Sequence, residues 1–359
     1  MAITLISNNS GGNTTIKMSG IARYSLCLYK ELKKKGDVQF FETPPAPWWS
    51  FYIGKIVRRD IETVLRGIPL TFPKLLPSGK NTLLHCTSQT LAIPLLYHKG
   101  KTLITVHDLI PVATKEETSP SEKFLYFFIL MGLKKADHII ADSEYTKKDI
   151  IKYADIPAEK ITVIHLGIDH KLFYDKKKKK EKNTILYVGS EQKRKNVELI
   201  IKALPLIKKE IPSIKFVKIG QAQDNKNRQK LMELAKEYGV DNHIIWKDYV
   251  EDISEEYNKA GIFVFPSLYE GFGFPVLEAM ACGCPVICSN NTSIPELAGD
   301  AALYCDPTSE QDIAEKIVKM MKDKKMQAMF RKRGLAQAKK FTWEKCAEET
   351  VKAYTKCLS

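Results

Sequence analysis

The sequence predicts an α/β protein of two domains, each built around a parallel sheet. Its 359 residues exceed the roughly 250 to 300 at which a single hydrophobic core stops growing. Short apolar runs alternate with turns and amphipathic stretches, which is the pattern of parallel strands joined by crossover helices. The charged run at residues 175–182 has no apolar residue to bury, so we interpret it as a solvated linker between the domains, or as a lysine patch for anionic lipid.

Apolar runs mark the predicted strands. In the first half these are residues 3–7, 82–86, 101–106, 138–141 and 163–166, and in the second half 184–188, 214–219, 243–246, 262–265, 285–289 and 302–304. Helical patterns in the first half cover residues 21–35, 122–135 and 144–154. The apolar stretch 124–133 is too short to span a membrane, so we interpret it as a buried helix. We place the domains at residues 1–170 and 171–340, followed by a last segment at 341–359.

The composition is that of a soluble globular protein, with 44% hydrophobic and 27% charged residues. The chain opens without the basic start or cleavage site of a signal peptide, so we expect a cytoplasmic protein. Eight cysteines without a secretion signal indicate reduced thiols. Cys282, Cys284 and Cys288 lack the paired spacing and the nearby histidine of a zinc site, so we expect no metal.

Both halves of the chain are basic. Residues 1–170 carry 22 basic and 16 acidic residues, and residues 171–359 carry 34 and 26, which together make the net charge of +14. This charge suits nucleic acid, an anionic membrane surface or acidic small molecules. No helix-turn-helix, zinc or RNP signature is present, so we expect no nucleic-acid partner. Residues 44–59 mix aromatic and basic side chains, which fits either peripheral binding to the inner face of a membrane or a packed loop followed by a helix.

The segment from residue 265 to 287 has the pattern strand, glycine loop, helix, strand. Gly271 and Gly273 let backbone amides approach an anion closely, and Pro275 suits the start of a helix, whose positive end then faces the loop. We interpret this loop as a phosphate cradle. Glu278 is placed to bind the hydroxyls of a ribose, and Glu270, nearer the loop tip, those of a sugar. The alternative is that each acid merely complements the helix dipole.

This segment resembles the retaining glycosyltransferases with the GT-B fold often called family 4. Two glutamates separated by seven residues, with Gly-Phe-Gly-Phe-Pro between them, match the family signature from Glu270 to Glu278. The resemblance implies two Rossmann-like domains facing a cleft, with the acceptor bound by the N-terminal domain and a nucleotide diphosphate sugar by the C-terminal one. It also implies that Phe272 and Phe274 belong to the donor site, and that residues 341–359 form a helix crossing back to the N-terminal domain.

A second match covers residues 186–196, where a strand enters a loop with a cluster of cations. Many family members carry Gly-Arg early in this loop; here Gly189 is followed by Ser190, and we expect both to border the donor. Lys195 keeps the family's lysine position and Arg194 supplies the guanidinium. An Arg fork and a Lys point charge would offset the charge that builds on the departing diphosphate. The alternative is a set of surface cations at a helix start.

A third match is Thr105-Val-His-Asp-Leu-Ile-Pro, where a strand ends. The resemblance implies that His107 contacts the transferred sugar, and that Asp108 orients the loop or approaches the acceptor. Gly12 and Gly20 resemble the glycine loop before the first helix, with Gly20 the better contact to the donor and Gly12 assigned to the acceptor. Residues 246–250 resemble the region whose backbone meets the nucleobase, which adds Tyr249 and Val250 to the donor site. Residues 141–146 and 163–169 are interpreted as structural.

The resemblance implies a hexosyltransferase that retains anomeric configuration and needs no cofactor or metal. GDP-mannose is favoured as donor over UDP-sugars, with a glycan or lipid-linked acceptor in surface polysaccharide synthesis. An epimerase or phosphorylase on the same fold, a basic nucleic-acid-binding protein and a silent binding module are the alternatives. A hydrolase would need two carboxyl groups flanking the bond to be broken, and Glu270 and Glu278 are better explained by hydroxyl binding.

Overall fold

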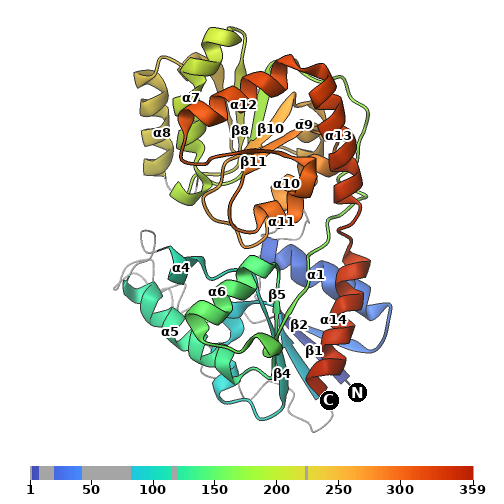
Figure 1. Ribbon diagram of the computed structural model, residues 1–359. Helices are drawn as coiled ribbons and strands as arrows, with labels where there is room; N and C mark the ends of the chain where they lie inside the picture. The colour runs from blue at the N-terminus through green and yellow to red at the C-terminus, as the bar shows by residue number, and fades with distance from the viewer. Residues whose placement is uncertain (1, 8–19, 43–81, 115–119, 223–224, 359) are drawn as a thin grey trace. The chain divides into compact units, whose positions relative to one another are not determined.

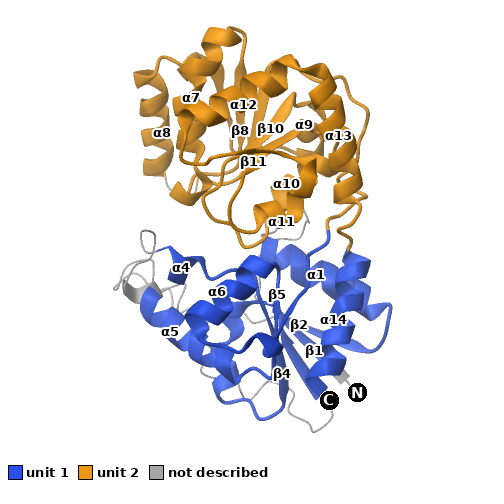
Figure 2. Cartoon of the chain, in the orientation of Figure 1, with its two compact units in different colours: residues 1–167, 343–359 blue, residues 168–342 orange. Residues whose placement is uncertain are grey.

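The computed structural model describes residues 2–7, 20–42, 82–114, 120–222 and 225–358 (Figure 1). The chain divides into two compact units, coloured separately in Figure 2. Unit 1 comprises Met1–Gly167 and Trp343–Ser359, and unit 2 comprises Ile168–Thr342. Gly12 and the aromatic and basic segment 44–59 lie outside the described residues. No helix of the described residues is long and apolar enough to cross a membrane.

Unit 1 contains a six-stranded parallel sheet in the order β2-β1-β3-β4-β5-β6. Its strands are β1 (Ala2–Ser7), β2 (Val38–Glu42), β3 (Thr82–Cys86), β4 (Lys101–Val106), β5 (His138–Ala141) and β6 (Ile161–Val163). Its α-helices are α1 (Gly20–Lys33), α4 (Ile110–Ala113), α5 (Pro120–Lys135), α6 (Glu144–Ala154) and α14 (Trp343–Leu358), and the short 3₁₀ turns are η2 (Gln89–Leu91), η3 (Ile93–Leu96) and η4 (Ala158–Lys160).

Unit 2 contains a second six-stranded parallel sheet in the order β12-β11-β10-β7-β8-β9. Its strands are β7 (Thr184–Val188), β8 (Lys215–Ile219), β9 (Ile244–Lys247), β10 (Ile262–Phe265), β11 (Val286–Ser289) and β12 (Leu303–Cys305). Its α-helices are α7 (Val197–Glu210), α8 (Asn225–Glu237), α9 (Ile253–Lys259), α10 (Phe274–Ala281), α11 (Ile294–Ala298), α12 (Glu310–Lys322) and α13 (Lys324–Ala338), with 3₁₀ turns η5 (Lys193–Lys195), η6 (Asp241–His243) and η7 (Gly299–Ala301).

The α/β class with parallel sheets is therefore confirmed, and two details of the strands differ. The strand β2 was not predicted, because its short run at the edge of the sheet carries polar residues among the apolar ones. The strand β6 lies two residues earlier than predicted, since it pairs with β5 from Ile161 to Val163. Ile164, the next residue, still donates its amide to the carbonyl of Ala141 at 2.9 Å.

The lysine run at residues 175–182 belongs to unit 2 and does not link the two units. It is solvated as predicted over most of its length, since residues 177–179, 181 and 182 are exposed. Its residues are tied to unit 2: Lys176 donates to Asp252 at 2.6 Å, and the backbone amide of Glu181 donates to the carbonyl of Lys259 at 2.7 Å. Asp175 forms an ion pair with Arg331 of α13. These contacts attach the run to unit 2, and the boundary between the units falls before Ile168.

The last helix, α14, packs in unit 1 beside α1 (Figure 1). His85 of β3 joins it to the sheet, with Nδ1 2.8 Å from the Tyr354 hydroxyl and Nε2 2.8 Å from Oγ1 of Thr105. Burial lowers the pKa of His85 to about 3, so this imidazole is neutral. Helix α14 thereby contributes to the core of unit 1, although the whole of unit 2 separates it from β6 in the sequence.

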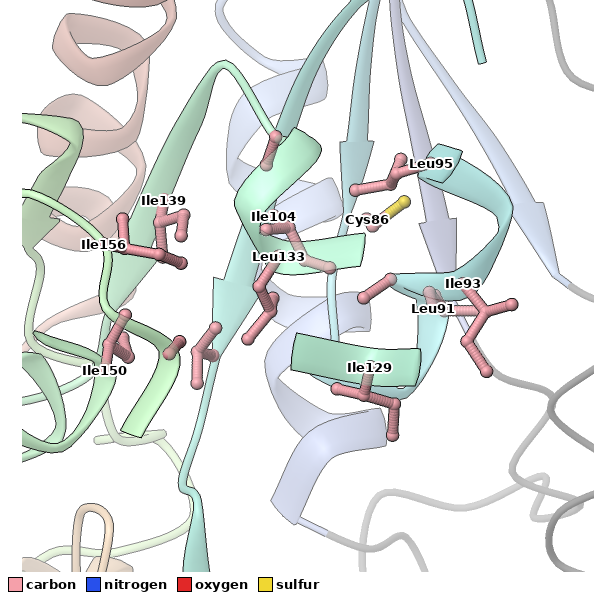
Figure 3. Close-up of a cluster of buried hydrophobic side chains, with 14 of the residues drawn as sticks. Cys86, Leu91, Ile93, Leu95, Ile104, Ile129, Leu133, Ile139, Ile150 and Ile156 are labelled. Atoms are coloured by element: carbon pink, nitrogen blue, oxygen red, sulfur yellow. The ribbon is translucent and has the colours of Figure 1, made fainter. Parts of the chain in front are cut away.

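Buried aliphatic residues from α5, α6 and the sheet form the core cluster shown in Figure 3. Ile104 and Ile139 pair across β4 and β5, and Ile129 and Leu133 reach them from α5. Ile150 of α6 is fully buried in the same cluster, whereas its neighbour Ile151 is 39% exposed. Ile150 therefore lies on the buried face of α6 and Ile151 on its exposed face.

We expect Ile150→Ala to lower the free energy of unfolding by about 2 to 5 kcal/mol, because it removes buried methyl groups and leaves a cavity. The matched change Ile151→Ala removes the same atoms from the exposed face and should cost no more than about 0.5 kcal/mol. Urea denaturation followed by circular dichroism measures both. Equal losses for the two variants would contradict the packing of α6.

Candidate functional site

The glycine loop between β10 and α10 has a closed and specific backbone shape. Gly273 has a φ of +118°, a backbone conformation that strains any residue with a side chain, and a Cβ at this position would also displace Cδ1 of Ile294, which lies 2.7 Å away. The Ser293 hydroxyl lies between two backbone carbonyls of the loop, 2.9 Å from that of Glu270 and 2.7 Å from that of Phe272. The loop is thus held from the α11 side while α10 begins directly after it.

The cations after β7 contact this loop. The Lys195 ammonium donates to Oε1 of Glu270 at 2.6 Å, and Arg194 NH1 lies 3.6 Å from Oε2 of the same carboxylate. Arg194 NH1 also donates to the carbonyl of Tyr269 at 3.1 Å. The Ser267 hydroxyl lies 2.6 Å from Oε1 of Glu270. The structure therefore brings together three residues that the sequence assigned to one site, namely Arg194, Lys195 and Glu270.

Backbone contacts fix the two loops against each other. The amide of Leu268 donates to the carbonyl of Arg194 at 2.7 Å, and the side-chain amide of Asn196 donates to the carbonyls of Pro266 and Pro307. Asn196 adopts the left-handed conformation between η5 and α7, where asparagine is well tolerated. Lys193, by contrast, is exposed. The alternative of loose surface cations therefore fits Lys193 and does not fit Arg194 or Lys195.

The second glutamate of the motif, Glu278, is buried in α10. The fully buried Tyr257 of α9 donates from its hydroxyl to Oε2 of Glu278 at 3.1 Å. Tyr257 is itself held edge-on against Phe263 and Phe173. A tyrosine inside an amphipathic helix carries no sequence signal for such a role, so Tyr257 was missed.

The remaining candidates in unit 2 follow the ends of β7 and β9. Ser190 accepts a hydrogen bond on its carbonyl from the Tyr187 hydroxyl, and the amide of Gly189 donates to the carbonyl of Ile219 at the end of β8. Tyr249 is 56% exposed and Val250 partly buried. Gly271 and Phe274 flank the closed turn already described. Because the strands are parallel, these loops leave the same edge of the sheet.

A buried charge cluster, which sequence reasoning missed, lies among these strand ends. The ammonium of Lys218, fully buried in β8, donates to Oε1 of Glu191 and to the carbonyl of Gly220. Arg228 of α8 joins Glu191 to Asp248 and lies over the ring of Trp246. Burial lowers the pKa of Lys218, and the carboxylate of Glu191 opposes that shift. The cluster ties the loops after β7, β8 and β9 together.

In unit 1, His107 lies just past the end of β4 and is 6% exposed. Its Nδ1 is 2.6 Å from Oδ2 of Asp142, and its Nε2 is 2.8 Å from the carbonyl of Thr87. Both ring nitrogens face acceptors, so the doubly protonated imidazolium satisfies both contacts. Burial by itself lowers the pKa of His107, but the Asp142 carboxylate outweighs it and the pKa is raised. Asp142 belongs to a segment that the sequence presented as purely structural.

Other candidates of unit 1 have simpler surroundings. Asp108 accepts the amide of Ile110 at 3.1 Å and so orients the loop that enters α4. Gly20 is the exposed first residue of α1. Gly12 lies outside the described residues. Across the described part of the chain, no group of three or more His, Cys, Asp or Glu side chains is arranged to hold a metal ion.

The fold and the paired glutamate loop define a two-unit glycosyltransferase of the GT-B class. Residues 169–337 match the family model described as glycosyl transferases group 1, and residues 18–172 match the model of glycosyltransferase family 4. The chain belongs to this family, as the sequence signature implied. It is 30% identical to the O-antigen chain mannosyltransferase B of Escherichia coli, over 94% of this chain and 96% of that relative.

Further relatives and solved structures agree with this assignment. The serotype-specific mannosyltransferase WbdA of Escherichia coli is 30% identical over 76% of this chain, which corresponds to 36% of its own length. Sucrose-phosphate synthase from Thermosynechococcus elongatus superposes with a TM-score of 0.77 at 20% identity, covering 99% of this chain and 98% of that one. The Anabaena protein Alr3699/HepE, solved with UDP and glucose, reaches 0.73 at 17% identity, covering 99% and 100%. These two likenesses concern the fold alone.

The His107 contact leads to a titration prediction. Replacing Asp142 by Asn removes the carboxylate that raises the pKa of His107 and leaves burial, which lowers it. We expect His107 to titrate above about 6.5 in the natural protein and below that value in Asp142→Asn. Imidazole ¹⁵N NMR reads both, with neutral His85 as the internal control.

The same pKa shift determines how the stability of the fold depends on pH. Since the folded-state pKa of His107 is raised, its protonation stabilises the fold below the unfolded value of about 6.5, and this contribution is lost as pH rises through the raised pKa. An unchanged His107 titration in Asp142→Asn would show that Asp142 does not hold the charge.

Proposed function

We propose that this glycosyltransferase transfers a mannosyl residue from GDP-mannose to a glycan or lipid-linked acceptor in surface polysaccharide synthesis. We further propose that it retains anomeric configuration and uses no metal ion. The observation that carries the proposal is the contact of Lys195 and Arg194 with Glu270 on a closed glycine loop. Relatives named as O-antigen mannosyltransferases support the choice of sugar and pathway class.

We propose that donor binding changes the partner of Lys195 and Arg194 from Glu270 to the diphosphate. In the ligand-free structure Glu270 neutralises Lys195 and approaches Arg194. A diphosphate carries more negative charge than one carboxylate, so we propose that it takes over these cations and releases Glu270 toward the hydroxyls of the sugar. Glu278, oriented by Tyr257, binds the hydroxyls of the ribose.

The same cations then serve the chemical step. When the bond between the sugar and the diphosphate breaks, negative charge builds on the leaving oxygen, and Arg194 and Lys195 stabilise it. The acceptor hydroxyl enters on the face from which the diphosphate leaves, and the diphosphate takes its proton. The anomeric configuration of the product, measured by NMR from the one-bond carbon–hydrogen coupling at the anomeric carbon, tests retention. Because His107 has both ring nitrogens bonded, any contact with the sugar requires it to exchange one of those partners.

A UDP-sugar is the second candidate donor. It is kept because a protein of the same fold, Anabaena Alr3699/HepE, was solved with UDP and glucose. An epimerase or phosphorylase on this fold is less well supported, because the relatives are named as transferases that build polysaccharides. A nucleic-acid-binding role has no support from the family assignment.

Nucleotide choice is testable by thermal shift in EDTA with GDP, UDP and ADP and their sugar conjugates. We expect GDP and GDP-mannose to raise the melting temperature, since a ligand at one hundred times its Kd stabilises the native state by about 2.7 kcal/mol. A shift with UDP alone would replace the proposed donor. Binding that appears only when a divalent metal replaces EDTA would refute the metal-free proposal.

Lys193, two residues before Lys195 in the sequence, provides a matched control for the role of Lys195. We expect Lys195→Gln to weaken nucleotide diphosphate binding about 10- to 100-fold, because a hydrogen bond to a charged group contributes about 1.5 to 3 kcal/mol. Lys193→Gln removes an equal charge from an exposed position and should leave binding nearly unchanged. Calorimetric titration measures the Kd of both variants. An equal loss of affinity in the two would show that Lys195 contributes only general positive charge.

A further inference from the structure

The loop between β11 and α11, at residues 290–293, contains a strained residue. Thr292 has a φ of +53°, in the left-handed region. Among the described residues other than glycine that have a positive φ, Thr292 alone is branched at Cβ, and a β-branched side chain is poorly tolerated in this conformation. Such strain persists only where the surrounding contacts maintain it, and it is concentrated at functional sites. The contacts of Thr292 therefore indicate its role.

The side chains of this loop bond to the backbone of the glycine loop that follows β10. Oγ1 of Thr292 accepts a hydrogen bond from the amide of Glu270 at 3.3 Å. The side-chain amide of Asn291 donates to the carbonyl of Leu268 at 3.0 Å. Because β10 and β11 are parallel neighbours, the two loops leave the same edge of the sheet, and α11 lies beside α10 (Figure 1).

Ser293, the next residue, gives up a local contact to reach the same loop. It is the N-cap residue of α11, where a serine side chain usually accepts a backbone amide of the first turn, yet it makes no such bond. Its fully buried hydroxyl is bonded instead to the carbonyls of Glu270 and Phe272. Consecutive side chains of one loop thus bond to the amide and the carbonyl of Glu270.

These two backbone bonds fix the direction in which the Glu270 side chain leaves the chain. In the ligand-free structure its carboxylate is also bonded to Lys195 and to the Ser267 hydroxyl. When a diphosphate takes over Lys195, as in the proposed function, the carboxylate loses that partner. The bonds from Thr292 and Ser293 involve no cation that the diphosphate recruits, so they persist and keep Glu270 in place.

We propose that Thr292 is a positioning residue of the donor site, whose hydroxyl oxygen keeps the Glu270 carboxylate directed at the sugar of the nucleotide sugar. The strained backbone of Thr292 is the conformation that places this oxygen at the Glu270 amide. The inference rests on the proposed role of Glu270 in binding the sugar hydroxyls. Since Thr292 acts through Glu270, it serves recognition of the sugar and not of the nucleotide.

Three substitutions separate the hydroxyl of Thr292 from its backbone. Thr292→Ser keeps the hydroxyl, Thr292→Val removes it and keeps the branched Cβ, and Thr292→Gly removes it and relieves the left-handed conformation. We expect Thr292→Ser to keep the kcat/KM of the natural protein for the nucleotide sugar. Thr292→Val and Thr292→Gly should each lower it about tenfold, the upper range for one neutral hydrogen bond.

Thermal melting distinguishes this role from a purely structural one. Thr292→Gly should melt at a higher temperature than Thr292→Val, because glycine adopts a positive φ without strain. The two variants should nevertheless lose activity alike, since both lack the hydroxyl. Calorimetric titration with the bare nucleoside diphosphate should give a nearly unchanged Kd in both, because Glu270 meets only the sugar.

Asp155→Gly is the matched control. Asp155 is also left-handed, with a φ of +51°, but it is exposed at the C-terminal end of α6, where glycine is favoured. This variant should keep full activity. The assay uses whichever nucleotide sugar the natural protein transfers, so a failure of GDP-mannose refutes the proposed donor and leaves this test intact.

The proposal is overturned if Thr292→Gly keeps the natural kcat/KM, or if the activities of the three variants follow their melting temperatures instead of the presence of the hydroxyl. An equal loss of affinity for the bare nucleoside diphosphate and for the nucleotide sugar also overturns it, since Thr292 would then not act through Glu270. If Thr292→Val fails to fold, the comparison of Thr292→Gly with Thr292→Ser decides.

Discussion

Parallel strand pairing is the constraint on which the rest of this structure depends. Every strand pair in both sheets is parallel, so all strands of a sheet end at one edge. In unit 2 this places the loop that carries Arg194 and Lys195 beside the loop that carries Glu270, although 75 residues separate Lys195 from Glu270 along the chain. The same geometry gathers Glu191, Gly220 and Asp248 in the charge cluster.

Paired charges hold these strand ends in place. Removing an ion from water is costly unless a partner of opposite charge compensates it, so a buried ion restricts the position of the group beside it. Lys195 and Glu270 join two loops in this way, Lys218 and Glu191 join β8 to the loop after β7, and His107 and Asp142 join the ends of β4 and β5. Lys195, Glu270 and His107 are therefore both candidate ligand groups and structural anchors.

The two buried histidines of unit 1 show how neighbouring groups determine the charge of an imidazole. His85 and His107 are both enclosed in unit 1, yet His85 faces hydroxyl groups and stays neutral, whereas His107 faces a carboxylate and a carbonyl. Burial disfavours the charged form of each, and only Asp142 supplies enough opposing charge to reverse the shift.

The sequence by itself determined the α/β class, most strands and the motif from Glu270 to Glu278, because periodicity and glycine loops are local properties of the chain. It also singled out Arg194 and Lys195 without indicating that Glu270 binds them. Tertiary structure alone decided the roles of Tyr257, Lys218 and Asp142 and the place of the lysine run in unit 2. It also leaves Phe124 66% exposed, although the sequence predicted a buried helix at residues 124–133. These depend on contacts between distant segments, and a residue's own neighbours in sequence carry no record of which side chains fold against it.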